Sequence, residues 1–387
     1  MTPIVNTHVH VPPNFSAFTT ARQVVEAAQA EGVSILGLSN FFDQQVYSQM
    51  GQMITEAGIL PLFGLEFITV VPDLEAQGIR INDPANPGRM YLTGKGIDPC
   101  RTPTTGAAQI AAEIRRGNDD RAEKMVARVA EHFFNTGFDT GLDAETIIAQ
   151  VATRSEVPTT WVSLQERHIA QAFQEAVFGF TGEKRTHVLT QAYGCPPHER
   201  EDPVAVQAEI RSRLLKSGTP GFVPEAGLSF EDAYTYILDM GGIPCYPILA
   251  DGSDPICPFE ASPSKLVDQI LDRGIYAAEL IPIRNHSALV DEYVHVLRSA
   301  GLIVMAGTEH NTLDRIPIDP SCVDGPMSIT ARQGFFEGTC VVAAHADLIS
   351  RNQPGYVDSS GARVGEVSTL AGHGKTMVQV LSYPGRT

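Results

Sequence analysis

The sequence predicts an α/β fold: a distorted (β/α)7 barrel, similar to a TIM barrel, that carries a helical insertion domain. Short apolar runs alternate with amphipathic segments over the first 70 residues, and the same alternation returns near residue 242. Helical patterns dominate the stretch between them. Strands that alternate with helices through short links are typical of a parallel sheet. Six or seven such units favour a closed barrel, whose strands all point their C-terminal ends at one face.

The first three strands are expected where the N-terminal part of the chain is apolar. Residues 6–10 end the first strand, and Thr19 or Thr20 can cap the helix that follows it. The nearly continuous apolar run at residues 33–38 suits a buried parallel strand. After a second helix, residues 60–70 are expected to form the third strand.

A helical insertion then interrupts this alternation. Residues 71–105 are rich in proline, glycine and asparagine and hold one strand-like piece, residues 89–93. Helical patterns follow at residues 121–134, 144–151, 164–177, 203–216 and 230–239. We therefore expect two structural units, namely a barrel formed by residues 1–103 and 240–387 and an insertion domain formed by residues 104–239.

The alternation resumes after the insertion. Strands are expected at residues 242–249, 275–283 and 302–306, with helices between them at residues 264–272 and 287–300. One further helical segment lies around residues 334–350. The glycine-rich tail after it has few signals of ordered structure.

Composition and charge limit the classes of function. The chain has 387 residues, 43% of them hydrophobic, and a formal net charge of −17. This charge argues against general binding to nucleic acids or membranes, although a small anion could still bind in a locally positive pocket. No apolar run approaches the roughly 18 residues of a membrane span, and because residues 1–10 do not show a basic region followed by an apolar one, we expect no secretion signal. The six cysteines form no C-x-x-C pair, which indicates free thiols in a cytoplasmic protein.

Polar side chains gather at or just after the ends of the predicted strands. His8 and His10 lie two positions apart on the first strand, so their side chains point the same way. The C-terminal strand ends form the active face of a β/α barrel, so this clustering is what an active site requires. The other members of the set are Asn40, Asp43, Glu66, Asp251, Glu279, Glu309, His310 and Asn311.

Two histidines and two carboxylates from this set can together hold one divalent metal ion. An unpaired buried carboxylate is costly, and coordination of a metal removes this cost for the whole group, His8, His10, Glu66 and Glu309. Simpler explanations exist for each residue alone. The histidines could lie on the surface of an edge strand, Glu66 could accept from a backbone amide, and Glu309 could cap the next helix.

The sequence resembles the PHP family (polymerase and histidinol phosphatase), whose metal-dependent phosphoesterases fold as a distorted seven-stranded β/α barrel. Matching motifs follow one another in the family's order from residue 5 to about residue 311. In the first half of the barrel, Asn6-Thr-His8-Val-His10 resembles the family's opening H-x-H, Phe63-Gly-Leu-Glu66 its metal-bridging glutamate, and Tyr91-Leu-Thr-Gly94-Lys-Gly-Ile-Asp98 its H-L-L-G-Y-x-I-D strand. In the helical insertion, Gln165-Glu-Arg167-His168-Ile-Ala170 resembles R-P-H-I-A. After the insertion, Gly241-Gly-Ile-Pro-Cys245 resembles G-G-V-P-V, Ala278-Glu279-Leu280 resembles I-E-V, and Ala306-Gly-Thr-Glu309 resembles the closing G-S-D-x-H.

The chain also departs from the family pattern. The family commonly binds three metal ions through nine ligands. The resemblance implies that this chain keeps the ligands of the first ion, His8, His10, Glu66 and Glu309. Other ligand positions hold Phe15, Phe41, Tyr91, Ile248 and Asn311. We therefore expect one divalent ion, Zn²⁺ or alternatively Fe²⁺ or Mn²⁺, because two imidazoles and two carboxylates suit several metals.

The remaining polar residues are candidates for the chemistry. A metal-bound water needs a base, and the candidates by position are Glu279, Asp251 and His310. Small shifts of register could instead make His310, Asp43 or Asp251 a metal ligand. With one metal, the leaving oxygen needs another cation. Arg167 and His168 of the insertion could bind the substrate in this role, or they could be an exposed pair on a helix.

Two further motifs are expected to be structural. His345 lies on an apolar helix face and is expected to be a hydrogen-bonded core residue. The segment Gly372-His-Gly-Lys-Thr376 resembles the end of a phosphate-binding loop, but Thr369 stands where that loop requires its first glycine.

The sequence thus predicts a metal-dependent hydrolase of PHP type, a phosphoesterase acting on a small phosphorylated metabolite or nucleotide through a metal-activated water. Two alternatives stay open. Loss of five family ligands favours a catalytically silent barrel that binds a ligand or partner. A single metal would also suit hydrolysis of carbon–nitrogen or carboxylic ester bonds.

Overall fold

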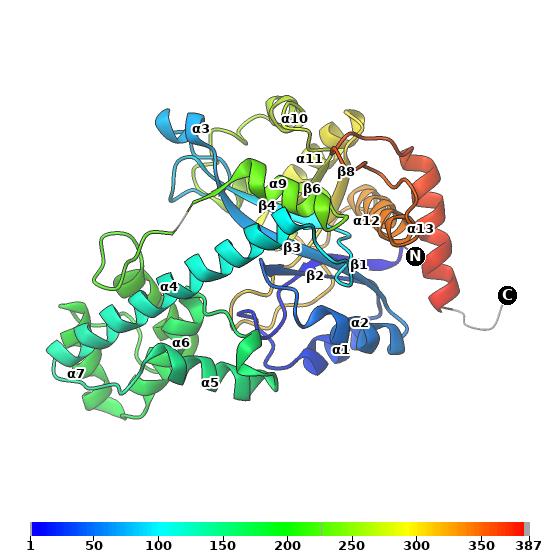
Figure 1. The fold of residues 1–387 in the computed structure, drawn as a ribbon. Helices are drawn as coiled ribbons and strands as arrows, with labels where there is room; N and C mark the ends of the chain where they lie inside the picture. The colour runs from blue at the N-terminus through cyan, green and yellow to red at the C-terminus, as the bar shows by residue number, and fades with distance from the viewer. Residues whose placement is uncertain (1, 226, 383–387) are drawn as a thin grey trace.

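The protein has a barrel-like sheet, seen in a computed structural model that describes residues 2–225 and 227–382 (Figure 1). In this part of the chain the strand order is β1-β2-β3-β4-β6-β7-β8, and the short β5 pairs with β3. The predicted distorted barrel fold is confirmed. The strands are β1 (Ile4–Val9), β2 (Val33–Phe41), β3 (Leu60–Val70), β4 (Arg89–Lys95), β5 (Leu228–Ser229), β6 (Ile243–Ile248), β7 (Ala277–Leu280) and β8 (Ile303–Ala306).

The sheet closes where β1 meets the segment just after β8. Val9 and Glu309 form a parallel bridge. The N–H of Glu309 donates to the carbonyl oxygen of His8 at 2.8 Å, and the N–H of His10 donates to the carbonyl oxygen of Glu309 at 2.7 Å. The backbone therefore holds the first and the last strand ends side by side at the active face.

One strand departs from the predicted parallel arrangement. β4 runs antiparallel to both of its neighbours, β3 and β6. Parallel neighbours need a crossover connection, usually a helix that returns along the sheet. The link between β3 and β4 holds only the short helix α3 (Pro72–Ala76), so the chain turns back directly. As a result Lys95, the last residue of β4, is buried inside the barrel.

The helices around the barrel follow the predicted alternation. Thr20 caps the first of them, as predicted, by accepting from the N–H of Gln23. Apolar faces of these helices and of the strands share one large hydrophobic cluster. The helices are α1 (Ala21–Ala30), α2 (Tyr47–Glu56), α9 (Phe230–Asp239), α10 (Pro263–Leu271) and α11 (Ser287–Ser299), with the 3-10 turns η3 (Ala250–Gly252) and η4 (Pro282–Arg284) at the ends of β6 and β7.

Two C-terminal helices, α12 (Ile329–Ser350) and α13 (Val367–Ser382), lie at the opposite end of the barrel from the insertion (Figure 1). They pack against the starts of the strands, including Val5 and Ile303. The expectation that the glycine-rich tail has little ordered structure was wrong for its described part, up to residue 382, while residues 383–387 lie outside the described residues. A Cβ at Gly374 would lie 2.1 Å from the carbonyl oxygen of Cys340 on α12, so glycine there permits close contact between the helices rather than a loop.

The insertion is a bundle of helices with a hydrophobic cluster of its own, drawn from residues 122–223. Its helices are α4 (Thr105–Asn135), α5 (Ala144–Ser155), α6 (Glu166–Phe178), α7 (Gly182–Tyr193) and α8 (Pro203–Ile210), with the 3-10 turn η1 (Thr159–Trp161) and the π-helix η2 (Arg211–Leu215). Helix α7 was not predicted, because it is largely polar and buries few apolar side chains.

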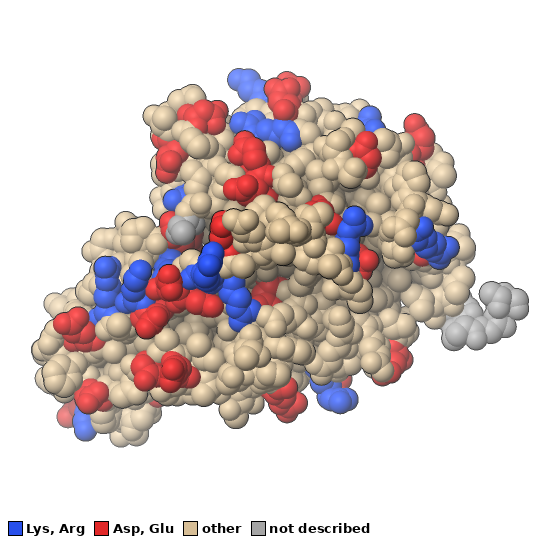
Figure 2. Space-filling view, viewed as in Figure 1, with Lys and Arg blue, Asp and Glu red and all other residues tan. Residues whose placement is uncertain are grey.

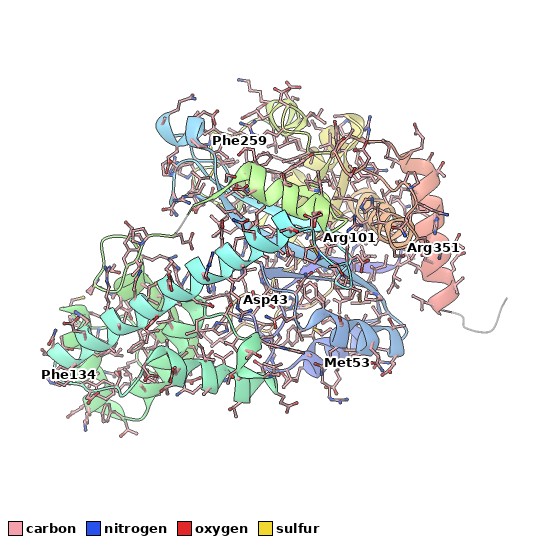
Figure 3. All side chains as sticks on the ribbon, viewed as in Figure 1. Asp43, Met53, Arg101, Phe134, Phe259 and Arg351 are labelled. Atoms are coloured by element: carbon pink, nitrogen blue, oxygen red, sulfur yellow. The ribbon has the colours of Figure 1, made fainter. Side chains whose placement is uncertain are left out.

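The packing also bears on the predicted domain boundaries, which stay a prediction. Helix α4 is longer than the expected residues 121–134, and its first turns, including Ile110 and Ile114, pack against the barrel. Ala233 and Ile237 of α9, which we assigned to the insertion, also belong to the barrel cluster. The far end of α4 extends away from the barrel, where Phe134 is exposed (Figure 3). No described helix is both long and apolar enough to cross a membrane.

His345 on α12 is a buried core histidine, as predicted, and it should make stability depend on pH. Its Nε2–H donates to the carbonyl oxygen of Gly241 (2.9 Å), and its Nδ1 accepts from the N–H of Tyr356 (2.9 Å). The contact with Tyr356 requires the neutral ring, because a protonated Nδ1 cannot accept a hydrogen bond. Burial lowers the pKa of His345 to about 4, although the bond to Gly241 opposes this shift.

Because His345 is neutral in the folded protein but protonates near its usual pKa of about 6.5 when unfolded, it stabilises the fold fully above pH 6.5. This contribution should be lost as the pH falls from about 6.5 to about 4, at roughly 1.4 kcal/mol for each pH unit. Urea unfolding of the wild type and of His345→Gln between pH 4 and pH 8 measures it. An equal pH dependence in both proteins would contradict the assignment.

Candidate metal centre and active site

Three of the predicted metal ligands come together at the C-terminal end of the barrel. His8 is the fifth residue of β1, His10 follows that strand, and Glu66 lies in β3. All three are buried, and one donor atom from each lies within 4.8 Å of the other two. The Nε2 atoms of His8 and His10 are 3.3 Å apart, and the Nε2 of His10 is 3.3 Å from an Oε atom of Glu66.

These separations fit a tetrahedrally coordinated metal ion. Donor atoms about 2.0–2.1 Å from a tetrahedral ion lie roughly 3.3–3.4 Å from one another. The Nδ1–H of His8 donates to Glu279, which leaves the Nε2 lone pair directed at His10. The Nδ1 of His10 is a buried atom without a hydrogen-bond partner among the described residues, and the Nε2 of this ring faces the other two donor atoms. The group His8, His10 and Glu66 therefore suits a metal ion.

Glu279 lies beneath this group and does not face solvent. One carboxylate oxygen accepts from His8 Nδ1 at 2.7 Å, and the other contacts the Nζ of Lys95 at 2.7 Å and accepts from the hydroxyl of Thr7 at 2.6 Å. Burial alone would raise the pKa of Glu279, but Lys95 and His8 outweigh it and lower the pKa to about 2. With both oxygens occupied and no exposure, Glu279 does not fit the predicted role of a base. It fixes the tautomer and orientation of His8 instead.

Glu309, the predicted fourth ligand, lies beside the group but is held by other partners. Its carboxylate forms a two-point ion pair with the guanidinium of Arg284, in which Nη1 is 2.7 Å from Oε1 and Nη2 contacts Oε2. The side-chain amide of Asn311 donates to the same carboxylate. Burial would raise the pKa of Glu309, but Arg284 outweighs it, so the pKa is lowered and the group is ionised. Among the described residues the candidate metal-binding group is therefore His8, His10 and Glu66, and the role of Glu309 as a fourth ligand stays a prediction.

The other two predicted bases, Asp251 and His310, are held in hydrogen bonds with neighbouring loop residues. Asp251 accepts from the side chain of Asn285 and from both the N–H and the Nδ1 of His286, each at 3.2 Å or less. His310 is buried, with its Nδ1 2.7 Å from the hydroxyl of Thr308 and its Nε2 3.0 Å from a backbone carbonyl. Neither residue lines the active-site cavity, so the structure does not support a catalytic role for them. Asp43, which is labelled in Figure 3, instead pairs with Arg115 of α4.

Arg167 and His168, the predicted substrate-binding pair, lie in different environments in the structure. His168 is buried in the capping box at the start of α6, where its Nδ1 accepts from the N–H of Gln165 at 3.1 Å. Burial lowers the pKa of His168 to about 3, so it carries no charge, and it does not fit the role of a substrate-binding cation. Arg167 lines the cavity, and none of the described residues forms a hydrogen bond or ion pair with its guanidinium. Burial, with nearby Arg211, lowers the pKa of Arg167 to about 10, so it remains charged.

A cavity of about 800 Å³ connects the metal-binding group to the insertion. His10, Glu66 and Glu309 line it on the barrel side. The same cavity is also lined by the five residues at positions where the PHP resemblance implies further metal ligands, namely Phe15, Phe41, Tyr91, Ile248 and Asn311. Four of these five side chains are aromatic or aliphatic, while the rest of the lining includes many polar and charged residues.

The insertion contributes a group of cations to this cavity. Arg121, Arg211 and Lys216 all contact the carboxylate of Glu166 at 2.7 to 3.2 Å. Burial would raise the pKa of Glu166, but the three cations outweigh it and lower the pKa to about 2. Three cations surround one carboxylate, and Arg167 follows it in the chain. On the face shown in Figure 2, by contrast, basic and acidic side chains are mixed.

Sequence reasoning missed two residues of the site, Lys95 and Arg284. Lys95 is a lysine within a strand of buried residues, which is a signal that could have been used, because such a charge needs a partner. Arg284 lies four residues after the end of β7, so a search limited to the strand ends overlooked it.

Comparisons with known proteins find likeness in structure alone, since no family model and no curated protein sequence matches this chain. A predicted metal-dependent phosphoesterase from Bifidobacterium adolescentis superposes with a TM-score of 0.56 at 15% identity, covering 87% of this chain and 97% of the other. An amidohydrolase from Chromobacterium violaceum, solved with bound sulfate and no metal, gives a TM-score of 0.52 at 18% identity, covering 82% of this chain and 93% of the other. The chain thus has the barrel fold of these two proteins, as its resemblance to PHP phosphoesterases implies.

Proposed function

We propose that this protein is a metal-dependent hydrolase, and specifically a phosphoesterase that acts on a small phosphorylated metabolite or nucleotide. The observation that carries the proposal is that the Nε2 of His10 lies 3.3 Å from both the Nε2 of His8 and an Oε atom of Glu66, beside a cavity that His10 and Glu66 line. Three protein ligands, two histidines and a glutamate, are the pattern of a catalytic zinc site, which keeps a fourth position open for water. A fourth protein ligand would close that position.

Different side chains of the candidate site would have different roles in such a reaction. A divalent ion in this group would lower the pKa of a bound water toward about 7 and polarise the scissile group. Glu279 orients His8, and Lys95 keeps Glu279 ionised. Arg284 and Arg167 line the cavity as permanent cations and suit a phosphoryl group. Glu309, whose carboxylate accepts from both Arg284 and Asn311, holds the guanidinium of Arg284 at the wall of the cavity.

Arg167→Ala should weaken substrate binding without removing the metal. A hydrogen bond to a charged group contributes about 1.5–3 kcal/mol, which corresponds to a rise in KM of roughly 10- to 100-fold. Arg116→Ala is the matched control, since Arg116 is an exposed arginine of the same insertion. Steady-state kinetics and metal content of both variants test the prediction. An unchanged KM in Arg167→Ala would show that the guanidinium does not contact the substrate.

The proposed function is tested by metal analysis and a substrate panel. The purified chain, dialysed with Zn²⁺ or Mn²⁺, is expected to hold a stoichiometric ion and to hydrolyse phosphomonoesters. Absence of the ion would favour the catalytically silent barrel. A metal-loaded protein that cleaves amides or carboxylic esters but no phosphoester would favour the second candidate, which the amidohydrolase neighbour supports.

A further inference from the structure

Two buried carboxylates at the metal-binding group need more than one positive charge to compensate them. Glu66 and Glu309 are both buried carboxylates on the wall of one cavity. An ionised carboxylate removed from water is stable only beside a compensating charge or strong hydrogen bonds. A metal ion held by His8, His10 and Glu66 would compensate one of them. Glu309 already has a cation of its own, the guanidinium of Arg284.

We propose that Arg284 supplies the second positive charge of the active site and thereby limits the centre to one metal ion. The inference rests on the proposed function, because it assumes a metal at His8, His10 and Glu66. It adds that the Arg284–Glu309 pair persists when that metal is bound, and that Glu309 does not become a ligand. In a site with this pair intact, a further divalent ion would meet a fixed positive charge and no free carboxylate.

The backbone holds both partners in place. Glu309 is fixed beside the histidines because its N–H and carbonyl oxygen are hydrogen-bonded to His8 and His10. Its φ of 61° is left-handed, a conformation that few residues other than glycine adopt without support from the surrounding structure. Arg284 ends the 3-10 turn η4, which follows β7 directly. The pair is therefore built from two strand ends that the barrel brings together, and the side-chain amide of Asn311 adds a third contact.

Arg284 also keeps donors for a substrate. A guanidinium has five N–H donors, and the two-point pair with Glu309 uses two of them. The side chain is 37% exposed and lines the cavity, so it is open to a bound anion. Unlike a second metal ion, this charge does not depend on the concentration of free metal, because arginine stays protonated in proteins.

Metal stoichiometry tests the inference without relying on activity. The wild type, Arg284→Met and the double variant Arg284→Met/Glu309→Gln are dialysed against excess Zn²⁺ or Mn²⁺, and bound ions per chain are measured by mass spectrometry. We expect one ion in the wild type, two in Arg284→Met, where Glu309 is left unpaired beside Glu66, and one in the double variant. Circular dichroism verifies that each variant is folded.

A second variant keeps the test decisive if Arg284→Met does not fold. The double variant Arg284→Met/Glu309→Gln, which removes both charges together, is expected to bind one ion with an affinity within about threefold of the wild type, since Glu309 is not a ligand. Loss of even a hydrogen-bonded partner outside the ligands weakens metal affinity roughly 10- to 100-fold, so a drop of that size in the double variant would overturn the inference. Two ions in the wild type, or one in a folded Arg284→Met, would also overturn it. A wild type that takes up no ion would overturn the proposed function and this inference together.

Discussion

Replacement of His8 by alanine is expected to remove the stoichiometric metal and to abolish hydrolysis. His8 contributes one of three donor atoms, and its ring is the one fixed from below by Glu279. Loss of a residue that only hydrogen-bonds to a metal ligand weakens metal affinity roughly 10- to 100-fold. Loss of a ligand itself should therefore weaken metal affinity at least about 100-fold. Equilibrium dialysis with Zn²⁺ or Mn²⁺ and phosphoesterase assays measure the two effects.

The matched control for this experiment is His295→Ala. His295 is an exposed histidine on α11 and is not part of the metal-binding group. This variant should keep both the ion and the activity of the wild type. If His8→Ala retains one ion with unchanged affinity, then the metal does not bind at this group, and the proposed function loses its basis.

The second large effect is expected for Lys95→Met. The variant leaves the carboxylate of Glu279 buried without its ammonium partner, at a position with no exposure to solvent. Removal of one partner of a buried ion pair costs about 3–5 kcal/mol in the free energy of unfolding. Lys95 also donates to the carbonyl oxygen of Thr7 at 3.0 Å, so the strand that carries His8 loses a contact as well. Urea unfolding measures the loss of stability.

Lys124→Met serves as the control for Lys95→Met, because Lys124 is an exposed lysine on α4. It should change the free energy of unfolding by less than about 0.5 kcal/mol. Metal titration adds a second readout, since a change in the charge beneath His8 should weaken metal affinity by roughly 10-fold or more. A Lys95→Met protein as stable as the wild type would mean that the buried pair contributes nothing to the fold.

The barrel could be predicted from the sequence because its strands are apolar runs separated by amphipathic helices. β2 and β3 are largely buried along their lengths, and this burial is what the apolar runs indicated. The antiparallel direction of β4 could not be predicted in this way, since a strand has the same side-chain pattern in either direction. The ordered glycine-rich helix α13 was also missed, because its glycines are explained by contact with α12.

The candidate metal-binding group likewise has features that could be predicted from the sequence and features that could not. His8 and His10 could be paired from the sequence, because alternate residues of a strand share a face. Glu66 could be added from its place at the active face. The roles of Glu279 and Glu309 could not be predicted, since they depend on Lys95 and Arg284, which are distant in the sequence and meet these carboxylates only in the closed barrel.

By itself, the sequence determined the fold class, and it predicted the face of the barrel that carries the candidate site and four candidate metal ligands, three of which lie together in the structure. These follow from periodicity and from local spacing, which act within a few residues. Only the tertiary structure decided which carboxylate faces the donors and which is paired with a cation. Charge compensation in a buried site acts through space over a few ångströms, so it depends on residues that the chain brings together from separate strands.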